Sequence, residues 1–104
     1  MRILIVDDDW NLVDTIKREI DWSYLQIKEV YTAYNMAAAM ELIERRQPEI
    51  VLCDIEMPLG SGIDLLKWIR KKQLPLEFIF LTCHDNFDFA SEAIEYGVSG
   101  YVVK

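Results

Sequence analysis

The chain has 104 residues, of which 52% are hydrophobic and 28% charged, with a formal net charge of −7. This composition predicts one globular domain, and the acidic balance argues against binding of nucleic acid by this segment. No apolar run approaches the ~20 residues of a membrane span. The two cysteines, Cys53 and Cys83, have no metal-site spacing and are too few for a disulfide framework, so we expect a reduced, cytoplasmic setting.

Short apolar runs alternate with amphipathic segments along the whole chain. The runs typical of strands are 2–6, 27–33, 50–53, 77–82 and 100–103, of which 27–33 is polar enough for a sheet edge. The segments typical of helices are 11–21 with Leu12, Ile16 and Ile20, a second with Met36, Met40 and Ile43, a third with Ile63, Leu66 and Ile69, and a fourth with Phe89, Ala93 and Ile94. Ser61 and Asp64 have the spacing of a capping box before the third helix. The alternation predicts an α/β fold with a parallel sheet.

Polar side chains follow several of these strands directly. Asp7, Asp8 and Asp9 come after the first strand and Asp54 after the third, and the last two strands end in Thr82 and Lys104. Ligands of such sheets bind beyond the carboxyl ends of the strands, so we expect these groups at one edge. Asp9 is expected to be only the N-cap of the first helix.

The expected cluster is strongly acidic. Asp7, Asp8 and Asp54 together carry about three negative charges at neutral pH, and Lys104 offers one positive charge. A divalent cation would balance them, and oxygen ligands with few carboxylates favour Mg²⁺. Because such a metal keeps open positions, it could bind a phosphoryl group, for which a carboxylate is a competent nucleophile. Thr82 and Lys104 could then stabilise the phosphoryl oxygens.

These residues resemble a known pattern. "VDDD" at 6–9, "DIEMPLGSG" at 54–62, Thr82 and "GYVVK" at 100–104 resemble the receiver domain of a two-component response regulator. The resemblance spans the chain and implies a doubly wound, flavodoxin-like five-stranded parallel sheet in the order 2-1-3-4-5.

The resemblance also implies a role for each matching residue. Asp54 would be the phosphorylated residue, and Asp7, Asp8, Asp54 and the backbone carbonyl of Glu56 would hold Mg²⁺. Thr82 and Lys104 would contact the phosphoryl group, and Thr82 and Tyr101 would form the switch. The donor would be a phosphohistidine of a sensor histidine kinase, and the protein would catalyse only its own phosphorylation and dephosphorylation.

The resemblance further implies a partner domain after residue 104. The chain stops before the fifth helix of such domains, so we expect 1–104 to be a receiver domain truncated before its last helix. A downstream output domain is expected to control transcription, and residues 86–104 resemble receivers with AraC-type DNA-binding output domains. Part of the sheet face that carries the first helix, including Val102, should then lie bare and could form a homodimer.

Departures from the pattern leave other readings open. Cys83 stands where the family usually has a very small residue, and His84 follows it in the expected loop, so either could affect access to Asp54. An aspartyl-phosphate phosphatase of the haloacid-dehalogenase type also uses an aspartate and magnesium at a strand end. Such a phosphatase needs a second aspartate where this chain has Glu56, and usually a cap domain. A degenerate receiver used only for protein contacts is the other alternative, which the intact Asp, Thr and Lys set argues against.

Overall fold

A computed structural model describes residues 1–57, 60–82 and 97–103, and of Thr82, Tyr101 and Val103 it describes the backbone. The helices in this part of the chain are α1 Trp10–Glu19, α2 Met36–Arg46 and α3 Gly62–Lys71. The strands are β1 Arg2–Val6, β2 Glu29–Ala33, β3 Ile50–Asp54, β4 Glu56–Met57, β5 Gly60–Ser61, β6 Glu77–Thr82 and β7 Gly100–Val103. The expected fourth helix, with Phe89, Ala93 and Ile94, lies outside the described residues.

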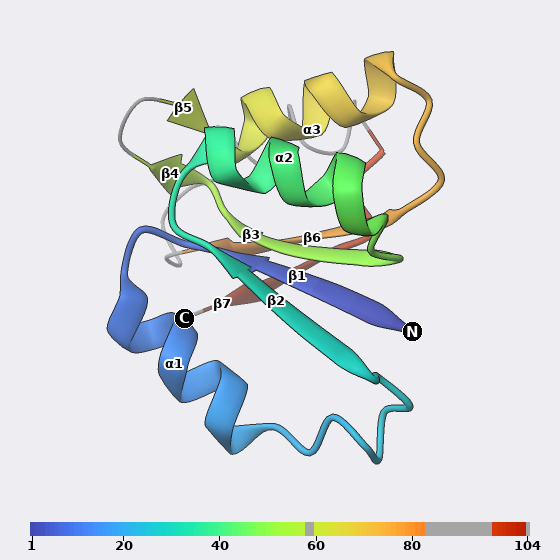
Figure 1. The fold of residues 1–104 in the computed structure, drawn as a ribbon. Helices are drawn as coiled ribbons and strands as arrows, with labels where there is room; N and C mark the ends of the chain where they lie inside the picture. Colours follow the sequence, from blue (N-terminus) through green and yellow to red (C-terminus); the bar gives the residue numbers. More distant parts are fainter. Residues whose placement is uncertain (58–59, 83–96, 104) are drawn as a thin grey trace.

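Five of the described strands form a parallel sheet in the order β2-β1-β3-β6-β7 (Figure 1). This is the predicted 2-1-3-4-5 order, because β6 and β7 are the fourth and fifth expected strands. The register places Val6 beside Cys53 and Asp54 beside Leu81. The carboxyl ends of β1, β3 and β6 therefore meet at one edge of the sheet.

Helices cover the sheet on both sides, which explains why the middle positions of its central strands β1, β3 and β6 are apolar. α2 and α3 lie together over one face, and α1 lies on the other (Figure 1). Alternate side chains of each strand point to opposite faces. Leu4 and Val6 thus pack under α2 and α3, while Ile3 and Ile5 pack with Val13 of α1.

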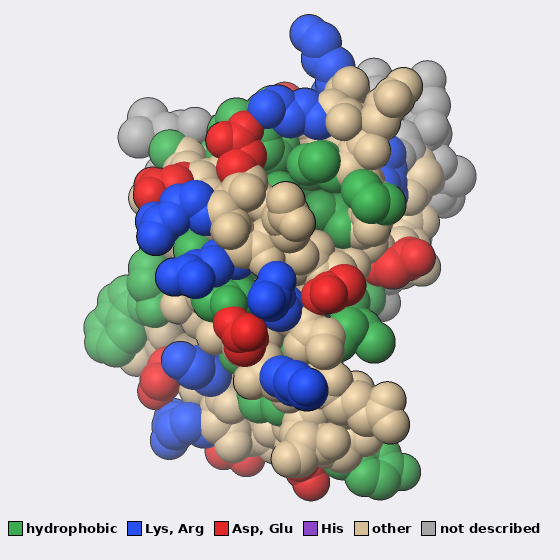
Figure 2. Space-filling model, turned by 45° about the vertical axis from the view of Figure 1, so that its right-hand side comes forward, with side chains coloured by type: hydrophobic (Ala, Val, Ile, Leu, Met, Phe, Trp, Pro, Cys, Tyr) green, Lys and Arg blue, Asp and Glu red, His purple; other side chains and the backbone are tan. Residues whose placement is uncertain are grey.

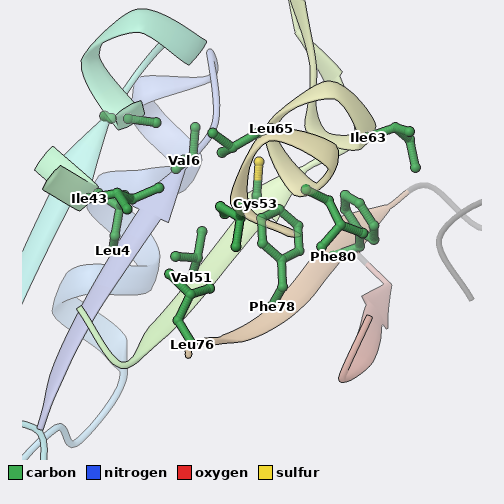
Figure 3. Packing of buried hydrophobic residues seen from close by; sticks show 14 of the residues in the cluster. Leu4, Val6, Ile43, Val51, Cys53, Ile63, Leu65, Leu76, Phe78 and Phe80 are labelled. Atoms are coloured by element: carbon green, nitrogen blue, oxygen red, sulfur yellow. The ribbon is translucent and has the colours of Figure 1, made fainter. Parts of the chain in front are cut away.

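The larger core lies between the sheet and the helices α2 and α3 (Figure 3). Phe78 and Phe80 of β6 meet edge to face, with ring centroids 4.9 Å apart. Ile63, Leu66 and Ile69 are all buried on α3, as their spacing predicted. The helix α3 is therefore fixed firmly against β3 and β6.

Side chains cap the start of each described helix, and two of these caps were predicted. Asp9 is the N-cap of α1 and accepts from the Leu12 N–H at 3.2 Å, as predicted. Ser61 and Asp64 form the predicted capping box of α3. Asn35 caps α2 in the same way, accepting from the Ala38 N–H at 2.8 Å.

The first helix and the second strand differ from their predicted ranges. The prediction of a helix over 11–21 was wrong at its end, because Ile20 has extended backbone (φ −90°, ψ 135°) and is 37% exposed. The fully buried residue of α1 is Val13 instead. The strand predicted over 27–33 begins at Glu29, since 20–28 form the turn that returns the chain to the sheet.

Two further features bear on the function. β4 and β5 pair antiparallel between β3 and α3, a small hairpin that the sequence did not predict. On the α1 face, Val102 of β7 is 47% exposed although its neighbour in register, Leu81, is buried. The side chain of Val102 is therefore partly exposed, as predicted, whereas self-association through this face stays a prediction.

None of the helices in the described ranges has both the length and the apolar content that crossing a bilayer requires.

Candidate metal and phosphoryl site

The end of β1 sets the first part of the site. Asp7 is fully buried, and its backbone N–H continues the pairing with β2 by donating to the Ala33 carbonyl at 3.1 Å. One carboxylate oxygen of Asp7 accepts from the Asp9 N–H at 3.0 Å. This bond turns the chain out of the strand, so that Asp8 is exposed and Asp9 caps α1. Of the three adjacent aspartates, one is therefore held inside by backbone contacts.

The end of β3 sets the second part. Asp54 is the last residue of the strand and is only 7% exposed. The thiol of the buried Cys53 donates to the Asp54 carbonyl at 3.2 Å. The register sets Cys53 beside Val6, so the residues that come next, Asp54 and Asp7, are brought to the same point of the sheet edge.

The structure brings the three predicted carboxylates together. One oxygen from each of Asp7, Asp8 and Asp54 lies within 4.8 Å of the other two. Two of these residues are buried and one is exposed, so the cluster is fixed on its inner side and open to solvent on its outer side. Like charges this close repel, and a bound cation would remove that repulsion.

The donor set fits Mg²⁺. It consists of carboxylate oxygens, the ligands that Mg²⁺ prefers, and an open outer side leaves positions for water or a phosphoryl oxygen. Glu56 is exposed at the start of β4, and its side chain is not one of the three in the cluster. The expected role of its backbone carbonyl as a metal ligand stays a prediction.

Of the other predicted site residues, the structure describes either the backbone alone or nothing. Thr82 ends β6 opposite Val103, and Tyr101 lies opposite Phe80 in β7, so both are on the strands where the sequence placed them. Cys83, His84 and Lys104 lie outside the described residues. The roles assigned to Thr82, Tyr101 and Lys104 are therefore taken up below as proposals.

Gly62 was not among the predicted site residues. It is buried at the first position of α3, where a side chain would collide with the Asp54 backbone. The sequence feature that could have revealed the need for glycine at position 62 is the pair of glycines, Gly60 and Gly62, on either side of the capping residue Ser61. Spacing alone could not tell a glycine needed for a turn from one needed for a close contact.

Away from the site, the face on which α2 and α3 end carries charges of both signs (Figure 2). Arg2 pairs with Glu29 at 3.3 Å, and Lys72 of α3 pairs with Glu44 of α2 at 2.7 Å. In Figure 2 basic and acidic side chains alternate over this face, and they do not form a continuous basic surface. The expectation that this segment does not bind nucleic acid stays a prediction.

A parallel sheet in this order, covered by helices on both faces, defines the class of flavodoxin-like α/β domains, and here a carboxylate cluster lies at the carboxyl ends of β1 and β3. Within that class, the family model for the response regulator receiver domain matches residues 3–104. The chain therefore belongs to the receiver domain family of two-component response regulators.

Named relatives and solved structures agree with this assignment. The chain is 34% identical over 103 residues to the uncharacterized transcriptional regulatory protein YesN of Bacillus subtilis, covering 99% of this chain and 28% of that protein. It is 33% identical to the transcriptional regulatory protein HptR of Staphylococcus aureus, covering 99% and 40%. The receiver domain of AraT, a response regulator from Geobacillus stearothermophilus, superimposes with a TM-score of 0.90 at 32% identity, covering 99% of this chain and 80% of that one. The chain thus spans two fifths or less of these curated relatives.

Proposed function

We propose that Asp54 accepts a phosphoryl group from the phosphohistidine of a sensor histidine kinase, with Mg²⁺ held by Asp7, Asp8 and Asp54. The observation that carries this proposal is the convergence of three carboxylates within 4.8 Å, two of them buried, at the carboxyl edge of the sheet. Three carboxylates this close repel one another, and a bound cation would remove that repulsion, so a cluster at this place supports a cation-binding site. A cytoplasmic location belongs to the same proposal.

The proposed transfer is a displacement at phosphorus. A carboxylate oxygen of Asp54 attacks the phosphorus atom, the P–N bond to the kinase histidine breaks, and an aspartyl phosphate forms. The imidazole leaves with the electron pair of that bond and takes up a proton. When bound, Mg²⁺ would neutralise charge on the phosphoryl oxygens. Asp7 and Asp8 would hold the ion beside Asp54, and Thr82 and Lys104 would contact the phosphoryl oxygens.

Phosphorylation by a small donor tests the proposal without a kinase. Acetyl phosphate with Mg²⁺ should add one phosphate to the chain, seen by intact-mass spectrometry, and hydroxylamine should remove it because the bond is an acyl phosphate. Chelation of the metal should abolish the gain, and Asp54→Asn should show none. Equal labelling of Asp54→Asn would refute the assignment, and no labelling of the wild type would favour a degenerate receiver.

The metal site has a reporter of its own. Trp10 begins α1, three residues after Asp7, and is 64% exposed. Binding of Mg²⁺ should change its emission, and Asp8→Ala should abolish the response. A titration that is unchanged in Asp8→Ala would place the metal elsewhere.

We further propose that Thr82 and Tyr101 form the switch. The Thr82 hydroxyl would move toward the phosphoryl group on Asp54, and Tyr101 of the neighbouring strand would turn into the space that it leaves. Structures with and without a beryllofluoride mimic of the phosphoryl group should differ in the Tyr101 rotamer. The same rotamer in both would remove Tyr101 from the mechanism.

The output of the switch is proposed to be transcriptional. Two relatives, YesN and HptR, are named as transcriptional regulatory proteins, and this chain covers only 28% and 40% of them. A DNA-binding domain joined to this receiver would therefore be the element that phosphorylation controls. Reporter expression driven by the full-length protein should change on Asp54→Asn, and an unaffected reporter would contradict this part of the proposal.

A further inference from the structure

The start of α3 lies directly against the phosphoacceptor residue. Gly62, the first residue of the helix, is buried, and its N–H donates to the Ile55 carbonyl at 2.7 Å. This short bond ties the helix start to the residue that follows Asp54. The contact is between backbones, so it sets the position of the chain at the end of β3.

No side chain fits at Gly62. A Cβ atom built there would lie 2.3 Å from the Asp54 carbonyl oxygen and 2.8 Å from Cε1 of Phe80. Both distances are far below van der Waals contact, and the closer atom belongs to the backbone rather than to the end of a flexible side chain. Any residue other than glycine must therefore move either α3 or the Asp54 backbone.

Several contacts hold the start of α3 in place. The capping box between Ser61 and Asp64 fixes its first turn, and Ile63, Leu65, Leu66 and Ile69 are buried against the core. Moving α3 would break those contacts together, whereas Asp54 is the last residue of β3. The displacement is therefore expected to reach Asp54, whose carbonyl oxygen is the nearest atom to the added Cβ.

We infer that Gly62 is a positioning residue for Asp54: by lacking a side chain it lets α3 seat the Asp54 backbone where its carboxylate meets Asp7 and Asp8. The positioning is a property of the fold, whereas its effect on phosphoryl transfer rests on the proposed function. Small displacements matter for such a transfer, because reacting groups must be held close to the productive geometry.

Gly62→Ala tests this inference, with Gly100→Ala as a matched control. Nothing lies within 4 Å of a Cβ added at Gly100, so that variant adds the same methyl group without a collision. The first readout is the chemical shift of the Asp54 carboxyl and carbonyl carbons in labelled, folded protein. A residue that merely stabilises the fold would change the unfolding midpoint and leave these resonances in place.

The second readout is the rate of phosphorylation by acetyl phosphate at saturating Mg²⁺. We expect Gly62→Ala to shift the Asp54 resonances and to slow labelling by roughly tenfold to a hundredfold, with Gly100→Ala within about twofold of the wild type. Unshifted Asp54 resonances together with an unchanged rate would overturn the inference. If the wild type takes no phosphate, the proposed function fails, and the resonances alone decide the positioning role.

Repeating the experiment in a Phe80→Leu protein separates the collision with the Asp54 carbonyl from the collision with the Phe80 ring. It also gives a second test if Gly62→Ala alone does not fold. Phe80→Leu removes the ring that a Cβ at Gly62 would meet and leaves the Asp54 carbonyl in its path. Gly62→Ala in the Phe80→Leu background should still shift the Asp54 resonances relative to Phe80→Leu alone. A full return to the parent resonances would show that Phe80, and not Asp54, bears the collision, and would refute the inference.

Discussion

Replacing Asp8 by Asn should stabilise the metal-free protein. The change removes the exposed charge of the cluster and keeps the shape of the side chain. Two unit charges 4.8 Å apart repel by about 0.9 kcal/mol in bulk water, and Asp8 has two such neighbours, Asp7 and Asp54. Dissolved salt weakens the repulsion at this exposed position, so we expect a gain of about 1–2 kcal/mol in the free energy of unfolding.

Urea unfolding in the presence of a chelator measures this gain. For a domain of this size it corresponds to a rise in the urea midpoint of roughly 0.5–1 M. Added Mg²⁺ should reverse the order of the two proteins, because a ligand at a hundred times its Kd stabilises the wild type by about 2.7 kcal/mol. Asp8→Asn, having lost a ligand, should gain much less from the metal.

Glu56→Gln is the matched control, since it removes an exposed carboxylate from β4 that is not one of the three in the cluster. Its midpoint should rise less than that of Asp8→Asn when the metal is chelated, and it should keep the response to Mg²⁺. A metal-free Asp8→Asn protein that is less stable than the wild type, or that still responds fully to Mg²⁺, would refute the electrostatic account of the cluster.

Four further substitutions test other parts of the structure by the same unfolding assay. Leu66→Ala, at a fully buried position of α3, should cost about 2–5 kcal/mol, whereas Leu25→Ala at a half-exposed position should change stability by less than ~0.5 kcal/mol. Ser61→Ala removes the α3 cap and should cost about 0.5–2 kcal/mol, and no loss would mean that the cap contributes nothing. The Arg2 N–H, which donates to Glu49, holds the pKa of that carboxyl below its ordinary value. Because this pKa is lowered in the folded protein, the ionised carboxylate of Glu49 stabilises the fold at pH values above its pKa, and Glu49→Gln should lower the free energy of unfolding at neutral pH. The difference in unfolding free energy between the variant and the wild type should vanish as the pH falls through the Glu49 pKa. A difference that persists in acid would contradict this.

Much of the sheet could be predicted because its strands are buried on both faces. The ranges expected for β1 and β6 match the structure, since continuous apolar runs of this length leave little choice of boundary. The position of Asp7, Asp8 and Asp54 followed from topology alone, because parallel strands end at one edge.

The parts that could not be predicted depend on contacts distant in sequence. The strands β4 and β5, in which Glu56 pairs with Ser61, are too short to show a periodicity of apolar residues in the sequence. Ile20 continues the apolar spacing of α1, but the chain has already turned away from the sheet there. The need for glycine at Gly62 arises from the Asp54 carbonyl, which only the packed fold brings against it.

The most direct test of the central claim is to locate the phosphoryl group on the chain. After reaction with acetyl phosphate and Mg²⁺, borohydride reduces an aspartyl phosphate to homoserine, which tandem mass spectrometry can assign to one position. We predict homoserine at position 54, and none there when the metal is chelated. Homoserine at the positions of Asp7 or Asp8, or none anywhere, would contradict the account of Asp54 as the phosphoacceptor.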